Sequence, residues 1–219
     1  MIKGLIFDLD GVITDTAEYH YLAWKSLAEK IGIEIDREFN EQLKGISRME
    51  SLELILERGG KADAYTDAEK EELATQKNEE YKESIKEITP KDILPGISEL
   101  LKEAKEQKLG LVLASASKNG PAIMERLEIM DLFDGIVDPA SLKAGKPDPE
   151  IFVRGAEMLG LSTRECVGLE DAEAGIQAIN GADMFSVGVG SEEAMREADY
   201  AVADTADLNL QTILEKAGS

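Results

Sequence analysis

The chain has 219 residues, which allows one domain of about 100–200 residues with a smaller inserted domain. Its formal net charge of -21 at pH 7 argues against nucleic acid or an anionic membrane surface as a partner. No apolar run is long enough to span a membrane, no signal-type segment opens the chain, and the single Cys166 cannot form an internal disulfide. We therefore expect a cytoplasmic protein.

The first predicted strand is the apolar run Leu5-Ile6-Phe7, which leads into Asp8, Asp10 and a turn at Gly11. Side chains two positions apart in an extended segment point to the same face, so both carboxylates can approach one reacting centre. Like charges this close raise each other's pKa unless a cation or hydrogen-bond donors hold them. The alternative is a solvated acidic turn, but the direct strand-to-turn context favours a shared proton or a bound metal.

From Ala17 to about residue 88 the pattern is helical and contains no convincing strand. Apolar residues recur at helical spacing before Gly32, and again before the pair Gly59-Gly60. A third helix is predicted to begin at Thr66, because Thr66 and Glu69 form a capping-box pattern.

After Pro90 the periodicity changes. Strand-like segments alternate with helical stretches, which predicts a parallel sheet built from βαβ units; these segments are 110–114, 135–137, 166–169 and 185–187. The fold class is therefore α/β, with a core formed by residues 1–14 and 90–219 and an all-helical cap at 15–89.

Chemically active side chains follow two further predicted strands, and another precedes a predicted helix. Ser115 follows a strand and leads toward a helix start, which favours anion binding. Lys146 precedes a helix and alone would be read as a solvated lysine, while Glu170 and Asp171 follow an apolar strand, where Asp171 could instead cap a helix. Because ligands of open α/β sheets gather beyond the carboxyl ends of the strands, we expect these groups to join Asp8 in one site.

Four carboxylates would meet at that site, those of Asp8, Asp10, Glu170 and Asp171. Without a cation at least one of them would have to stay protonated. Oxygen ligands alone suit Mg²⁺ better than Zn²⁺, so the sequence predicts a magnesium site.

The run DLDGVITDT, from Asp8 to Thr16, resembles the nucleophile loop of the haloacid dehalogenase-like phosphotransferases. The resemblance implies a Rossmann-like parallel-sheet core with an inserted helical cap. It also implies that Asp8 attacks phosphorus to form an acyl phosphate while Asp10 acts as general acid and base. Ser115 and Lys146 would hold the transferring phosphoryl oxygens.

The same resemblance implies a set of Mg²⁺ ligands. These would be the Asp8 carboxylate, the backbone carbonyl of Asp10 and the Asp171 carboxylate, with Glu170 close by or acting on the ligands rather than on the metal. Phosphoryl transfer depends on this kind of positioning and charge neutralisation.

Within that superfamily the chain resembles the β-phosphoglucomutases over nearly its whole length. The segments that carry this resemblance are Asp15–His20, Trp24, Leu43–Arg48, Lys77-Asn78 and Ser115–Asn119. It implies exchange of a phosphoryl group with β-glucose 1-phosphate to give glucose 6-phosphate, through β-glucose 1,6-bisphosphate as intermediate and activator. The partner is then a small sugar phosphate, with neither nucleic acid nor membrane, and we expect a monomer.

The resemblance also assigns residues to these tasks. His20 would hydrogen-bond near Asp10 and help couple cap closure to the general acid and base, and Thr16, where the chain enters the cap, would join the catalytic residues. Arg48 would hold the phosphate that is not reacting. The substrate-binding set would be Trp24, Lys44, Gly45, Ile46, Ser47, Arg48, Ser51, Lys77, Ala116, Ser117, Lys118 and Asn119.

Alternatives remain open at this point. By periodicity alone His20 is a core histidine, and Lys77 lays its stem over apolar surface. A sugar-phosphate phosphatase of the same superfamily would share every core residue, since exclusion of water decides whether the acyl phosphate is transferred or hydrolysed. A catalytically idle binding module is the third possibility.

Overall fold

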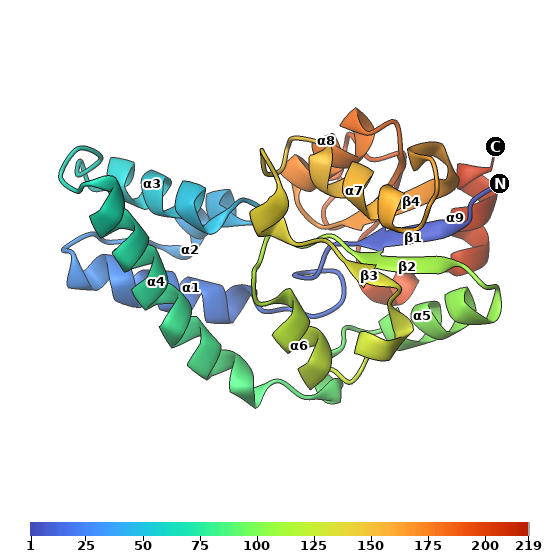
Figure 1. Ribbon diagram of the computed structural model, residues 1–219, viewed down its shortest axis with the longest axis horizontal. Coiled ribbons are helices and arrows are strands. Elements are labelled where there is room, and N and C mark those ends of the chain that lie inside the picture. The colour runs from blue at the N-terminus through green and yellow to red at the C-terminus, as the bar shows by residue number, and fades with distance from the viewer. Residues whose placement is uncertain (219) are drawn as a thin grey trace. The chain divides into compact units, whose positions relative to one another are not determined.

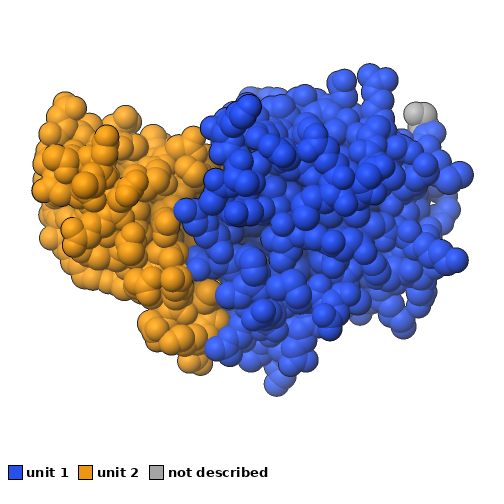
Figure 2. All heavy atoms as spheres, in the orientation of Figure 1, with its two compact units in different colours: residues 1–15, 88–219 blue, residues 16–87 orange. Residues whose placement is uncertain are grey.

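The computed structural model describes residues 1–218, and they form two compact units. Residues 16–87 make up the helical unit, and residues 1–15 and 88–218 make up the α/β unit (Figure 2). In the part of the chain that is described, no helix combines the length and the apolar character needed to cross a bilayer.

The α/β unit is built on one parallel sheet of six strands, within residues 1–218, in the order β3-β2-β1-β4-β5-β6 (Figure 1). The strands are β1 Gly4–Phe7, β2 Gly110–Leu113, β3 Gly135–Ile136, β4 Cys166–Glu170, β5 Phe185–Val189 and β6 Tyr200–Val202. The central strands read as continuous apolar runs because helices cover both faces of the sheet. The sequence predicted five of these strands, and the short edge strand β6 was not predicted.

Helices flank this sheet on both sides (Figure 1). They are α5 Ile97–Glu106, α6 Gly120–Arg126, α7 Glu150–Met158, α8 Glu173–Gly181 and α9 Leu210–Ala217. Ile6 of β1 and Val112 of β2 pack with Phe152 of α7 and Ile179 of α8 in one buried cluster, while α5 and α9 cover the opposite face.

The register of the sheet brings three strand ends together. Phe7 of β1 lies level with Leu113 of β2 and with Leu169 of β4. Asp8, the next residue, therefore leaves the sheet beside Ala114 and Glu170, and its backbone N–H still donates to the Leu169 carbonyl at 2.9 Å. This carboxyl edge of β1, β2 and β4 is the position where open α/β sheets bind ligands.

The helical unit consists of α1 Ala17–Lys30, α2 Arg37–Asn40, α3 Arg48–Arg58 and α4 Asp67–Ser84. Its core contains Trp24 and Leu27 of α1 together with Leu52 and Ile55 of α3. The predicted capping box at Thr66 is confirmed, because the Thr66 hydroxyl accepts from the backbone of Glu69 and the Glu69 carboxylate accepts from the backbone of Thr66.

Short 3-10 helices complete the secondary structure. They span Glu41–Leu43, Ile85–Glu87, Pro90–Asp92, Met130–Leu132, Pro139–Ser141, Thr163–Glu165 and Thr205–Asp207. Gly32 follows α1 with φ +71°, a left-handed conformation that agrees with its predicted role at the end of that helix.

Candidate active site

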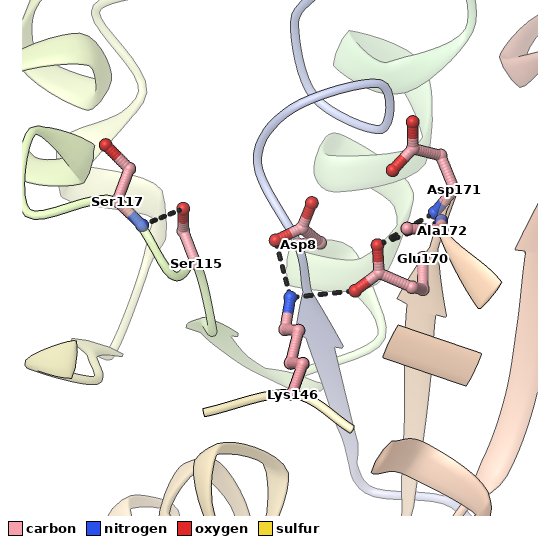
Figure 3. Close-up of polar contacts among 7 residues, drawn as sticks. All are labelled: Asp8, Ser115, Ser117, Lys146, Glu170, Asp171 and Ala172. Carbon is pink, nitrogen blue, oxygen red and sulfur yellow. Dashed lines mark hydrogen bonds and ion pairs between the residues drawn. The ribbon is translucent and has the colours of Figure 1, made fainter. Parts of the chain in front are cut away.

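Lys146 joins two carboxylates at the carboxyl edge of the sheet (Figure 3). Its ammonium Nζ lies 2.7 Å from Asp8 Oδ1 and 2.7 Å from Glu170 Oε2, and all three side chains are buried. Asp8 follows β1, Glu170 ends β4, and Lys146 comes from the loop before α7. The lysine that would alone be read as solvated is therefore part of a buried ion-pair cluster.

The second oxygen of Glu170 is held by the backbone. Glu170 Oε1 accepts from the N–H groups of Asp171 at 3.1 Å and Ala172 at 3.2 Å (Figure 3). Both oxygens of Glu170 are thus engaged, one with Lys146 and one with the start of the loop that carries Asp171. This arrangement suits a residue that orients Lys146 and Asp171.

Two glycines make room for these carboxylates. A Cβ on Gly175 would lie 1.9 Å from Glu170 Oε2, and a Cβ on Gly11 would lie 2.0 Å from Asp171 Oδ2. Gly11 also has φ +76°, which side chains rarely adopt. Neither glycine was predicted to contribute to the site, although a glycine inside a helix, such as Gly175 in α8, usually has a packing or functional reason.

Burial and neighbouring charges shift the pKa values of the cluster. Burial raises the pKa of Asp8 to about 7, the nearby Glu170 adds to that shift, and Lys146 acts against it. Burial and then Glu170 raise the pKa of Asp171 well above its ordinary value. Burial alone would lower the pKa of Lys146, but the carboxylates of Asp8 and Glu170 raise it above its usual range.

The acidic residues fit a divalent cation. Asp8, Glu170 and Asp171 each offer a carboxylate oxygen, and these atoms lie within 4.8 Å of one another. The donors are all oxygen, which Mg²⁺ prefers, and a bound cation would offset the cost of keeping several carboxylate charges in a buried site. The side chain of Asp10 is not in this group, and a contribution from its backbone carbonyl stays a prediction.

Asp10 lies in the turn that follows β1. This turn is closed by a hydrogen bond from the Gly11 N–H to the Thr14 carbonyl at 2.8 Å. Asp10 is also one of the charges that raise the pKa of Asp8, so the two carboxyl groups are close enough to interact electrostatically. Whether the two carboxylates act on one reacting centre stays a prediction.

The loop after β2 is organised around its own hydroxyl groups. Ser115 is buried, and its Oγ accepts from the Ser117 N–H at 3.1 Å (Figure 3). The Ser117 Oγ accepts in turn from the Asn119 N–H at 3.2 Å, just before α6. Ala116 and Lys118 complete this segment. It follows the strand next to β1, so it belongs to the same edge of the sheet as Asp8.

The residues expected in the cap form two groups within the helical unit. His20 and Trp24 lie on α1, and Lys77 on α4 places its Nζ 2.8 Å from His20 Nδ1 and 4.7 Å from the centre of the Trp24 ring. Thr16 occupies the N-cap position of α1, and its hydroxyl makes no capping hydrogen bond. The contact between His20 and Lys77 was not predicted from the sequence.

The second group lies around the start of α3. Ser47 caps this helix with a capping box, and Ser51 Oγ donates to the Ser47 carbonyl at 3.0 Å. Lys44 pairs with Glu41 at 2.8 Å on the surface, and Gly45, which precedes Ile46, has φ +73°. Arg48 is the first residue of α3, and its guanidinium has no hydrogen-bond or ion-pair partner among residues 1–218.

Comparison with known proteins finds a matching family and relatives that are similar over nearly the whole chain. A model of the haloacid dehalogenase-like hydrolase family matches residues 2–183. Beta-phosphoglucomutase from Bacillus subtilis is 54% identical over 98% of this chain and 95% of its own length. The crystal structure of beta-phosphoglucomutase from Clostridium difficile is 51% identical, with a TM-score of 0.98, and the match covers 100% of this chain and 98% of that one.

A more distant relative is a phosphatase. The phosphorylated carbohydrates phosphatase of Thermotoga maritima is 28% identical over 83% of this chain and 82% of its own length. The matches to the two mutases extend over the helical unit as well as the α/β unit. With the buried Asp8–Lys146–Glu170 cluster at the edge of a parallel sheet, these findings show that the chain belongs to the haloacid dehalogenase-like hydrolase family.

Proposed function

We propose that this chain is a β-phosphoglucomutase, which interconverts β-D-glucose 1-phosphate and glucose 6-phosphate. The observation that carries the proposal is the 54% identity to the Bacillus subtilis enzyme over nearly the whole chain, helical unit included. A phosphatase would need the same α/β residues, so the likeness of the helical unit is what favours the mutase.

Asp8 is the proposed nucleophile. A bond forms between one Asp8 oxygen and the phosphorus of a sugar phosphate while the bond from phosphorus to the sugar oxygen breaks, which gives an acyl phosphate. Asp10 gives a proton to the departing sugar oxygen and takes it back from the accepting hydroxyl in the reverse transfer. When the accepting hydroxyl is the 6-hydroxyl of β-glucose 1-phosphate, the bond from phosphorus to Asp8 breaks as the bond to that oxygen forms, which gives β-glucose 1,6-bisphosphate. Transfer of the 1-phosphate of this intermediate back to Asp8 then releases glucose 6-phosphate.

Lys146 and Ser115 are the proposed groups that hold the phosphoryl oxygens. Lys146 is already anchored by Glu170, so its ammonium remains in place when the Asp8 oxygen turns to phosphorus. Asp8, Asp171 and the Asp10 carbonyl would hold Mg²⁺, with Glu170 orienting Asp171 through the backbone. When bound, Mg²⁺ supplies positive charge that offsets the negative charge of the transferring group.

Arg48 is the proposed site for the second phosphate that a mutase must hold. It lies at the positive end of the α3 dipole, where a cation is disfavoured and an anion is favoured. Its guanidinium lacks an acidic partner among residues 1–218, and a phosphate oxygen pair would satisfy it bidentately. Lys77, Lys118, Ser117 and Asn119 are proposed to contact phosphate or sugar hydroxyls, and we propose a monomer that acts in the cytoplasm.

The test is to supply β-glucose 1-phosphate, Mg²⁺ and a trace of β-glucose 1,6-bisphosphate and to follow glucose 6-phosphate and free phosphate together. We expect glucose 6-phosphate with little free phosphate, and no product with Asp8→Asn. Free phosphate as the main product would assign the chain to the sugar-phosphate phosphatases instead. Neither product, from a folded protein that binds Mg²⁺, would contradict both assignments.

A further inference from the structure

Tyr81 touches both members of the pair formed by His20 and Lys77. The His20 ring is stacked on the Tyr81 ring, with centroids 4.0 Å apart and an angle of 13° between the planes. The Lys77 ammonium lies 4.8 Å from the centre of the same ring, and 4.7 Å from the centre of the Trp24 ring. The side chains of Tyr81, Trp24 and Lys77 are buried.

The four side chains come from two helices with the same spacing. His20 and Trp24 are four residues apart on α1, and Lys77 and Tyr81 are four residues apart on α4. Residues at this spacing share one helix face, and α1 packs against α4, so the two pairs form a single cluster. A buried ring in a closely packed interior has little freedom to rotate, so Tyr81 is a rigid support for its neighbours.

The contact between Lys77 and His20 also fixes where the imidazole carries its hydrogen. A lysine ammonium has three donors and no acceptor, so in the 2.8 Å contact Nδ1 of His20 must accept. A neutral imidazole that accepts at Nδ1 carries its hydrogen on Nε2. His20 then offers one N–H donor, and the plane of that donor is set by the ring of Tyr81.

We infer that Tyr81 is a positioning residue, which holds the His20 ring and the Lys77 ammonium in one arrangement and so keeps His20 in the Nε2–H tautomer. Stacking sets the plane of the imidazole, and attraction between the ammonium and the two ring faces keeps the donor beside Nδ1. The contacts that carry this inference lie within the helical unit and need no substrate. Its effect on turnover rests on the proposed function.

The single histidine of the sequence makes the tautomer directly measurable. In ¹⁵N-labelled protein without substrate, long-range ¹H–¹⁵N NMR spectra contain one imidazole, that of His20. We expect an unprotonated Nδ1 and a protonated Nε2. A protonated Nδ1 in the wild type would overturn the inference before any variant is made.

Variants then test the contributions of the Tyr81 ring and of Lys77 separately. Tyr81→Leu removes the aromatic face and should give a mixture of His20 tautomers, whereas Tyr81→Phe keeps the ring and should preserve the wild-type spectrum. Lys77→Met removes the donor and should also give a mixture. If Tyr81→Leu is folded by circular dichroism and its His20 spectrum is that of the wild type, the positioning role is rejected. If Tyr81→Leu does not fold, the His20 spectrum of Lys77→Met decides instead, and a wild-type spectrum there rejects the arrangement of His20 and Lys77 on which the role of Tyr81 rests.

Phe39→Leu is a matched control in the same unit. Phe39 is also a buried aromatic residue with a cation over its ring, since the Arg58 guanidinium lies 4.6 Å from the ring centre. It should lower stability without changing the His20 spectrum. For turnover we expect kcat to fall roughly 10- to 100-fold in Tyr81→Leu, the range for a misplaced group, and to change less than about threefold in Tyr81→Phe. If the wild type lacks mutase activity, the proposed function fails while the NMR result still decides the role of Tyr81.

Discussion

The ammonium group of Lys146 lies 2.7 Å from the Asp8 carboxylate, and both side chains are buried. The residues are 138 positions apart and meet because β1 ends at the same edge of the sheet toward which the loop before α7 runs. The contact links stability to chemistry, since Lys146 balances carboxylates that would otherwise repel one another, and the proposed reaction uses the same charge for a phosphoryl group.

Lys146→Met should therefore impair both properties. We expect phosphorylation of Asp8 to fall by roughly 100-fold or more, as when other preorganised donors are removed, measured by intact-protein mass spectrometry. The free energy of unfolding should fall by about 3–5 kcal/mol at pH 8, where two buried carboxylates lose their partner. Lys143→Met is the control, because Lys143 is an exposed lysine of the same loop. Equal phosphorylation in the two variants would contradict the assigned role.

Asp8 should make stability depend on pH in an unusual direction. Its pKa is raised from an ordinary 3.8 to about 7, so between these values the folded protein binds more protons than the unfolded chain. The stabilisation that Asp8 contributes is full below about pH 4 and is lost as the pH rises through about 7. In EDTA, the free energy of unfolding of Asp8→Asn should therefore rise relative to that of wild type as the pH increases through this window, by up to about 4 kcal/mol in total. Urea denaturation at each pH measures it.

Exposed carboxylates should not show this trend. Asp183→Asn is a suitable control, because the Asp183 side chain is 76% exposed. A difference between Asp8→Asn and wild type that stays constant from pH 4 to 8 would show that the pKa of Asp8 is not raised. Adding Mg²⁺ should reduce the difference above pH 7, since the cation favours the ionised carboxylate.

Gly175→Ala should weaken Mg²⁺ binding without touching a ligand. The new Cβ would lie 1.9 Å from Glu170 Oε2, which must move and release Lys146 or the loop of Asp171. We expect the Kd for Mg²⁺ to rise roughly 10- to 100-fold in isothermal titration calorimetry, as for other changes behind metal ligands. Gly181→Ala is the control in α8, because its Cβ would meet only ordinary contacts, 3.5 Å from Pro149. Identical affinities would refute this role of Gly175.

The sequence was most informative where chemistry coincides with secondary structure. Asp8, Ser115 and Asp171 each follow an apolar run, and parallel strands carry such residues to one edge, so their convergence followed from the predicted sheet. The strand β6 escaped prediction because three residues at a sheet edge carry almost no periodic signal.

Other features depend on contacts between distant segments. Nothing near Lys146 in the sequence distinguishes a buried ammonium from a solvated one, and its burial follows from Asp8 and Glu170. His20 and Lys77 are 57 residues apart, and each matched an ordinary packing pattern until α1 and α4 were placed together. The close approach of Glu170 to Gly175 also could not be predicted, because it depends on the path of the chain after β4.

An Arg48 variant can show whether the phosphate that reacts and the phosphate that does not react are bound by different residues. Acetyl phosphate is a small donor with one phosphate, so it can phosphorylate Asp8 without using a second phosphate site. Arg48→Ala should therefore form phosphoenzyme from acetyl phosphate at the wild-type rate, while kcat/KM for β-glucose 1-phosphate falls roughly 100-fold, the loss expected for about 3 kcal/mol of charge-assisted hydrogen bonds. Arg58→Ala is the control at the other end of α3. Equal losses in both reactions would show that Arg48 supports folding or phosphoryl transfer itself rather than binding of the second phosphate. No loss in either reaction would show that Arg48 does not bind phosphate.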